Sequence, residues 1–225
     1  MRFGKNCTDN IFKDKTKTMK KLYSLLCLSI ATLSFSQTHF GVKAGYNLSS
    51  MKWKIDGYDD IKFDSKSYFY AGGFAEHKIN DKFALQAELL YTELGGKMEE
   101  EVTDFVGNQV IIAGIATYKF KYPQLQIPIS AKYYFVSNFN ILGGFNFAFN
   151  LNPTVESDFV NNSPNGGKIE NAKTLNISPF LGAEYFLNQN ISVDARYNFG
   201  LFNSNSSGFD NRISYLQIGL AYHFK

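Results

Sequence analysis

Cysteine is almost absent from this sequence. The chain of 225 residues contains only Cys7 and Cys27, and none occurs in residues 37–225. A region without thiols has neither a disulfide framework nor a cysteine metal site. Residues 37–225 must therefore fold without covalent cross-links.

Long hydrophobic runs are also missing. After residue 36, no segment reaches the roughly 18 consecutive apolar residues that a membrane-spanning helix requires. The run over residues 22–35 has about 14 residues and is too short for an ordinary spanning helix. Any membrane-spanning role must therefore belong to β-strands.

The apolar run at residues 22–35 is instead typical of a leader. It follows two lysines and ends with Ser34 and Ser36 at the −3 and −1 positions of a cut after residue 36. This pattern predicts a secretory signal peptide at residues 19–36. Residues 1–18 are polar and mixed in charge, so we expect translation to start at the methionine that opens the signal peptide. Residues 37–225 are then the exported domain.

The basic character of the chain comes from the leader. The whole sequence has a formal net charge of +3, with 23 basic and 20 acidic residues. Seven of the basic and two of the acidic residues lie in residues 1–36, which leaves the exported domain near −2. The slightly acidic charge of this domain argues against a nucleic-acid partner.

The exported domain is rich in segments that alternate apolar and polar residues. Four of them are "HFGVKAGYNLS" (39–49), "KFALQAELLYT" (82–92), "ISVDARYNFGLF" (191–202) and "YLQIGLAYHFK" (215–225). A period of two predicts β-strands, and a length of about ten residues suits a tilted strand that crosses a membrane.

A hairpin unit occurs three times. Its first strands contain Ala75, Ala131 and Ala183, which lie 56 and 52 residues apart, and each leads through a short polar turn into a second strand. The expected turns are centred on residues 80–81, 137–138 and 188–189, and the expected long loops are 49–66, 95–117, 152–173 and 203–211. Three hairpins and one strand at each end predict an all-β fold, an eight-stranded antiparallel up-and-down transmembrane β-barrel.

Charged residues interrupt the apolar segments on one face only. In a closed barrel in lipid, the apolar face points outward and this charged face points into the lumen, where acids and bases can pair. The predicted lumen charge network is Lys43, Glu76, Glu88, Lys132, Glu184, Asp194 and Arg196. The alternative is a soluble barrel or sandwich with these charges in water. The export signal, the aromatic residues near strand ends and the alternation of short turns with long loops favour the membrane.

Two segments do not fit a simple register. Apolar residues occupy even positions over 118–122 but odd positions over 125–133, with Pro123 between them. A β-bulge would return both halves to one face, or else the first half stands above the membrane. Tyr68 and Tyr70 likewise have the opposite parity to Ala75 and His77, across Gly72-Gly73.

Candidates for chemistry are few. His39, His77 and His223 lie near expected strand ends, and no serine or carboxylate has a recognisable triad relation to them. The acidic stretches at 56–64 and 99–104 lack calcium-loop spacing. We expect no metal, no cofactor and no catalytic residue, and keep an outer-membrane barrel enzyme as a second alternative function.

Several segments resemble a known family. They are "HFGVKAGYNLS" after a "SFSQ" leader, "FAEHKINDKFALQAELLYTELGGK", "LQIPISAKYYF" and a terminal strand ending in "LAYHF". Over essentially the whole exported domain, they resemble the small outer-membrane β-barrel proteins of Bacteroidota, often labelled porin family. The resemblance implies location in the outer membrane and insertion by the outer-membrane assembly machinery, for which Tyr222 and Phe224 would be the signal.

The predicted function rests on the lumen and the loops. An eight-stranded barrel is just wide enough for side chains to fill it. The first interpretation is a structural or loop-display platform in the envelope, with lipid, the assembly machinery and an extracellular ligand as partners. The alternative is a narrow porin for small solutes.

Overall fold

The computed structural model describes residues 37–54, 57, 60–106, 109–158, 167–204 and 210–224. The leader predicted for residues 1–36 lies outside them. Residues His39–Lys225 form one compact unit. No helix in the described part of the chain is long and apolar enough to cross a membrane.

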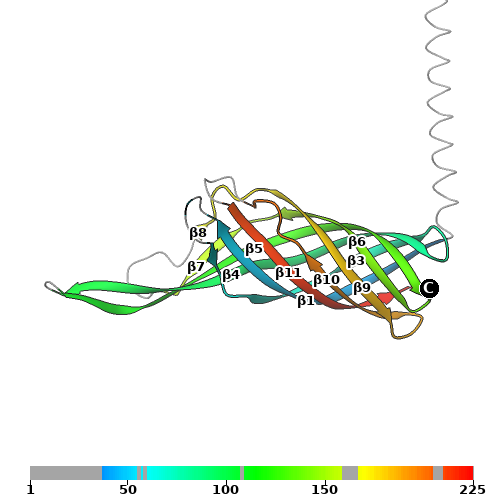
Figure 1. The fold of residues 1–225 in the computed structure, drawn as a ribbon, viewed down its shortest axis with the longest axis horizontal. Coiled ribbons are helices and arrows are strands. Elements are labelled where there is room, and N and C mark those ends of the chain that lie inside the picture. Colours follow the sequence, from blue (N-terminus) through cyan, green and yellow to red (C-terminus); the bar gives the residue numbers. More distant parts are fainter. Residues whose placement is uncertain are drawn as a thin grey trace, which may run out of the picture. The chain divides into compact units, whose positions relative to one another are not determined.

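The described residues form eleven β-strands (Figure 1). They are β1 (Thr38–Lys54), β2 (Ile61–Lys62), β3 (Lys66–Lys78), β4 (Phe83–Val106), β5 (Gln109–Val136), β6 (Phe139–Asn150), β7 (Thr154–Ser157), β8 (Gly167–Lys168), β9 (Leu175–Phe186), β10 (Ile191–Asn198) and β11 (Asp210–His223).

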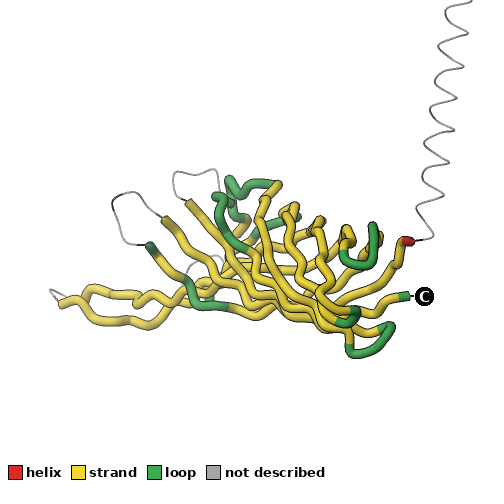
Figure 2. Tube along the Cα trace, turned by 45° about the vertical axis from the view of Figure 1, so that its right-hand side comes forward, coloured by secondary structure: helices red, strands yellow, loops and turns green. Residues whose placement is uncertain are grey.

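Eight of these strands close into a ring. Figure 2 shows the strands as long neighbouring tubes joined by short loops. Their order is β1-β3-β4-β5-β6-β9-β10-β11, and β11 returns to pair with β1 from Gly41↔His223 to Lys54↔Asp210. A closed ring leaves no unpaired edge, which a bilayer requires because lipid cannot satisfy backbone donors and acceptors. The predicted eight-stranded antiparallel barrel is confirmed.

Three short turns join consecutive ring strands at one end, here named the turn end. They fall between β3 and β4, between β5 and β6, and between β9 and β10, as predicted. The Asn80 side chain accepts hydrogen bonds from the backbone N–H groups of Lys82 and Phe83 at 2.9 Å. Asn188 does the same for Asn190 and Ile191. These side-chain-stabilised turns explain why the connections stay short.

The opposite end, here named the loop end, differs from the sequence prediction. Residues 95–117 were expected to form a loop, but β4 extends over residues 95–106 and β5 over residues 109–117 as a paired ribbon beyond the ring (Figure 1). The pairing continues from Gly95↔Lys121 to Val106↔Gln109, with one register shift between Val102 and Thr103. Cross-strand pairing satisfies the backbone groups that face the partner strand, so this polar stretch forms strands without a core of its own.

The other long loops also contain strand. β1 continues to Lys54 and pairs with β2, inside the predicted loop 49–66. Within the predicted loop 152–173, β7 pairs with β5, and β8 pairs with β7. The loop end therefore carries a small sheet in the order β4-β5-β7-β8. The prediction that these segments are loops without strands was wrong. A polar composition argues against a buried core, but polar residues can still form β-strands.

The register of β5 is continuous through Pro123. Glu93 pairs with Pro123 and Leu94 pairs with Tyr122, without the bulge that the sequence suggested. Even positions face inward on both sides, since Phe120 and Gln126 are both buried. The switch of the apolar residues from even to odd positions therefore marks a change from apolar to polar side chains in the barrel interior.

The register of β3 is continuous as well. Tyr70 pairs with Thr92, Glu76 pairs with Gln86, and no slip occurs at Gly72-Gly73. Tyr70 points inward and is fully buried against the facing pair Gly45↔Gly219. A Cβ at Gly219 would lie 1.9 Å from the Tyr70 hydroxyl. Because glycine has no side chain, Gly219 leaves the space that the Tyr70 ring occupies.

Candidate functional site

The wall of the ring separates apolar from charged side chains. On β4, Leu85 and Leu89 are 49% and 53% exposed, whereas Glu88 between them is 3% exposed. A soluble barrel would bury the leucines and expose the glutamate. The outer surface is instead the apolar one, as expected for a protein surrounded by lipid.

The structure places the whole predicted lumen network inside the ring. These seven side chains are buried: Lys43, Glu76, Glu88, Lys132, Glu184, Asp194 and Arg196. They come from six different strands, and they meet because each occupies an inward position of its strand. Their ion pairs divide them into two clusters, described next.

The first cluster joins opposite parts of the wall. Lys132 on β5 lies between two carboxylates, with its Nζ 2.7 Å from Glu76 Oε2 on β3 and 2.6 Å from Glu184 Oε2 on β9. The remaining carboxylate oxygens accept further hydrogen bonds, from the Tyr134 hydroxyl to Glu76 and from the Ser192 hydroxyl to Glu184, both at 2.7 Å. Buried charges are tolerated when they are paired and hydrogen-bonded in this way.

The second cluster is balanced in charge. Arg196 on β10 binds Glu88 Oε2 at 2.8 Å and Asp194 Oδ2 at 3.2 Å. Lys43 on β1 lies 3.0 Å from Asp194 Oδ1 and 3.5 Å from Glu88 Oε2. The guanidinium carbon also lies 5.2 Å from the centre of the Phe180 ring. Two cations and two anions thus connect β1, β4 and β10 across the interior.

Amide and hydroxyl side chains continue the interior toward the loop end. The Asn47 side chain donates to the Thr92 hydroxyl at 2.8 Å, and the Gln126 side chain donates to the side-chain oxygen Oε1 of Gln124 at 2.9 Å. Further along, Asn146 donates to the Tyr215 hydroxyl at 2.7 Å. This uncharged polar layer lies between the ion clusters and the side chains nearer the loop end.

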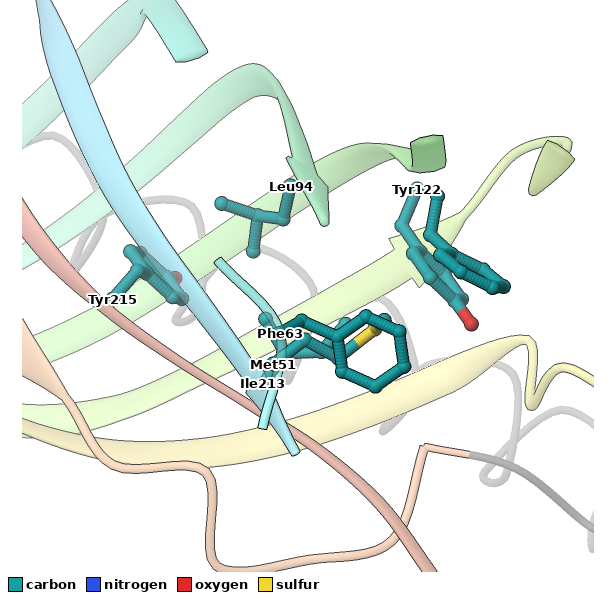
Figure 3. Packing of buried hydrophobic residues seen from close by; sticks show 7 residues of the cluster. Met51, Phe63, Leu94, Tyr122, Ile213 and Tyr215 are labelled. Carbon is teal, nitrogen blue, oxygen red and sulfur yellow. The ribbon is translucent and has the colours of Figure 1, made fainter. Parts of the chain in front are cut away.

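An apolar cap closes the interior near the loop end (Figure 3). It consists of Met51, Phe63, Leu94, Phe120, Tyr122, Ile213 and Tyr215. The Trp53 ring packs against it, with ring centroids 4.8 Å from Phe63 and 5.3 Å from Phe120 in edge-to-face geometry. A layer of large side chains contributed by several strands leaves little space between them.

The cavities agree with a filled interior. A cavity beside the apolar cap, between Gln124, Asn146 and Tyr215, measures about 20 Å³, which is close to the space of one water molecule. A larger hollow of about 680 Å³ opens at the turn end, where Glu76 and His223 are part of its lining. The mouth at the turn end is therefore wide, whereas the cavity beside the apolar cap is small.

The remaining predicted residues lie near the turn end. Tyr222 and Phe224 face outward, each 47% exposed, with ring centroids 5.7 Å apart. His39 is exposed and His77 is half-buried. His223 is buried, with its Nε2 2.9 Å from the Ser192 hydroxyl and 3.6 Å from Glu184.

Ion pairs also join β5 to β7 in the sheet at the loop end. Lys119 lies 2.6 Å from Asp158, and Lys121 lies 2.5 Å from Glu156. The hydrogen bond from Lys121 lowers the pKa of the Glu156 carboxyl, and the one from Lys119 lowers the pKa of Asp158. These pairs are exposed, so they orient the sheet and add little stability.

Sequence reasoning missed the apolar cap. Apolar residues at inward positions were not expected in a polar lumen, although the parity of Tyr118, Phe120 and Tyr122 was a signal for them. Within the described residues, no group of three or more His, Cys, Asp or Glu side chains could hold a metal ion.

The ring, its lipid-facing exterior and its paired interior charges define a transmembrane β-barrel. Residues 35–206 match the profile of the family described as "Outer membrane protein beta-barrel domain", and the chain belongs to this family. It is thus an outer-membrane protein. None of the curated proteins compared with the chain matches it.

Solved structures with a similar fold include Ail of Yersinia pestis, at 13% identity over 84% of this chain and 99% of that chain, with a TM-score of 0.47. Neisserial surface protein A shares 18% identity over 82% and 97%, with a TM-score of 0.43. OprG of Pseudomonas aeruginosa shares 14% over 83% and 95%, with a TM-score of 0.37. Identities at this level concern the fold alone.

Proposed function

We propose that this protein is a closed outer-membrane barrel that anchors a β-sheet outside the cell as a binding platform. In outer-membrane barrels the short turns face the periplasm and the longer connections face outward. The turn end is then periplasmic, and the sheet β4-β5-β7-β8 is extracellular. The observation that carries the proposal is the filled interior, in which two ion clusters and the apolar cap lie one after another.

The ion clusters alone would close the lumen only while their side chains stay paired. The apolar cap adds a second closure that does not depend on charge, since Met51 and Leu94 carry no charge and are buried by hydrophobic contact. An ion crossing the barrel would have to displace both layers. An eight-stranded ring offers no spare width for such a rearrangement.

Bilayer conductance tests the closed interior. We expect no discrete current steps from the purified protein, and none from Arg196→Ala, because the apolar cap remains in place when one ion cluster is weakened. The measurement is single-channel recording in planar bilayers, with insertion verified separately by flotation of the protein with lipid vesicles.

A narrow pore for small solutes is the second candidate, and the wide periplasmic mouth and the polar layer around Gln124 and Gln126 favour it. Regular steps from the wild-type protein would establish the pore and overturn the closed barrel. Steps only from Arg196→Ala would show that the ion cluster is the gate, and that the apolar cap is not a seal.

Display of the extracellular sheet can be tested by thiol labelling, since the exported domain has no cysteine. In a background with Cys7 and Cys27 replaced by serine, we expect Ile112→Cys on the ribbon to react with a membrane-impermeant maleimide on intact cells. Lys78→Cys at the turn end should react only after the outer membrane is permeabilised. The reverse pattern would contradict the proposed orientation.

We further propose that the protein has no enzymatic activity. Among the described residues, Ser192 lies beside His223 and Glu184, but this arrangement is unsuited to nucleophilic attack because Ser192 is fully buried and its hydroxyl donates a hydrogen bond to Glu184. We also propose that residues 1–36 are a leader and that residues 37–225 are the exported domain. The resemblance of the strand sequences supports an origin in Bacteroidota. It also supports insertion by the outer-membrane assembly machinery, with Tyr222 and Phe224 as the assembly signal.

A further inference from the structure

Three cations lie side by side on the outer surface near the loop end. Lys52 on β1 pairs directly with Lys62 on β2, and on its other side it pairs directly with Arg212 on β11. Directly opposed residues of antiparallel strands have Cβ atoms about 4.5–5.5 Å apart, and like charges at that separation repel. A row of three cations across three adjacent strands is therefore unfavourable unless an anion lies against it. We name these three residues the cationic row.

The cationic row faces outward, directly above the lipid-facing surface. Even positions of β1 point out of the barrel, and Tyr46 and Leu48 are 65% and 48% exposed there. Lys52 follows Leu48 by four residues. At about 3.3 Å per residue and a tilt near 40°, its Cα lies about 10 Å further along the barrel axis. Long cationic side chains at this level reach the headgroup layer of a bilayer.

The neighbouring acids lie on the side away from the membrane. Arg212 binds Asp210 at 2.8 Å, and Lys54 lies 3.8 Å from Asp60, with Lys54 and Asp210 directly paired across the strands. This mixed row is two residues further along the strands from the lipid than the cationic row. The membrane-proximal side of the patch is left positive.

Three donors in the cationic row remain available. Lys52 and Lys62 have no ion pair within the described part of the chain, and both side chains are exposed. Arg212 uses one terminal nitrogen for Asp210, while its buried Nε has no hydrogen-bond partner among the described residues. The nearby acid Asp64 is held through two backbone hydrogen bonds beside Lys97 on β4. Two ammonium groups and a guanidinium are the donors that bind phosphate.

We propose that the cationic row binds the phosphate group of a lipid headgroup in the outer leaflet. The position next to the apolar surface selects a lipid over a free anion, because the same molecule places its chains against Leu48 and Leu216 while its phosphate meets Lys52. This proposal concerns the outer wall of the barrel, and it does not depend on whether the lumen conducts.

Lipid retention tests this site. The purified protein, in nonionic detergent, is mixed with phosphatidic acid or with phosphatidylcholine, and bound lipid is counted by native mass spectrometry. We expect preferential retention of phosphatidic acid, and at least a tenfold weaker affinity for it in Lys52→Gln/Lys62→Gln. The matched control is Lys119→Gln/Lys121→Gln, which removes the same charge from the extracellular sheet and should leave retention unchanged.

Two results would overturn the proposal. One is equal retention by wild type and Lys52→Gln/Lys62→Gln, and the other is binding of inorganic phosphate alone with the affinity of phosphatidic acid. Folding is verified for every variant by the shift between heated and unheated protein on a denaturing gel, and Lys62→Gln alone provides a milder replacement. We also expect phosphatidic acid to raise the unfolding temperature of the wild type and not of the double variant.

Discussion

Replacement of Arg196 by methionine is expected to lower the free energy of unfolding by about 3–5 kcal/mol. The change removes the guanidinium that binds both Glu88 and Asp194, and Lys43 alone must then face two buried carboxylates. Removing one partner of a buried ion cluster leaves charge that neither water nor protein compensates. The measurement is urea unfolding in lipid vesicles, followed by tryptophan fluorescence.

A second replacement shows whether charge balance is the cause. The double variant Glu88→Met/Arg196→Met keeps one cation and one anion, Lys43 and Asp194, which lie 3.0 Å apart. We expect it to recover most of the lost stability, so that the two changes are strongly non-additive. Lys119→Met breaks an exposed pair and should cost less than about 1 kcal/mol. Equal costs for Arg196→Met and Lys119→Met would mean that the interior charges are solvated.

Replacement of Leu220 by arginine is expected to destabilise the barrel in lipid by about 2–4 kcal/mol. Leu220 is 57% exposed, and its strand partners Ala44 and Val193 place it in the middle of the apolar surface. On a soluble protein, an exposed leucine could change to arginine at almost no cost. In a bilayer, the introduced arginine places its charge in the hydrocarbon layer, which is unfavourable.

Ile115→Arg is the matched control for this substitution. Ile115 is 63% exposed on the ribbon of β4 and β5, beyond the ring. We expect a change within about 0.5 kcal/mol because the arginine stays in water. If the two arginine variants unfold at the same urea concentration in vesicles, the outer surface is not a lipid interface.

The segment around Pro123 shows why part of the interior escaped prediction. The residues of β5 alternate throughout, but Phe120 and Tyr122 are apolar at inward positions where Gln124 and Gln126 are polar. If every apolar residue of the strand is assumed to face outward, the facing of the side chains must change at Pro123. That assumption therefore predicts a bulge there. The structure keeps one register because the barrel interior itself changes from polar to apolar along its axis.

The ribbon formed by β4 and β5 shows the same limit at the loop end. Residues 99–104 carry three glutamates and an aspartate, which composition alone assigns to a loop. Pairing with residues 111–117 makes them strand, since alternate residues exchange backbone hydrogen bonds across the hairpin. The composition of a segment does not show whether a strand further along the chain pairs with it.

The sequence by itself determined the eight strands of the ring, the short turns and the division of the strands into an apolar and a charged face, because these depend on local order and a period of two. Only the tertiary structure decided which charges pair. Lys132 meets Glu76 and Glu184 across separations of 56 and 52 residues. It does so because ring closure sets which inward side chains share a level, and the same closure brings Met51, Tyr122 and Ile213 together into the apolar cap.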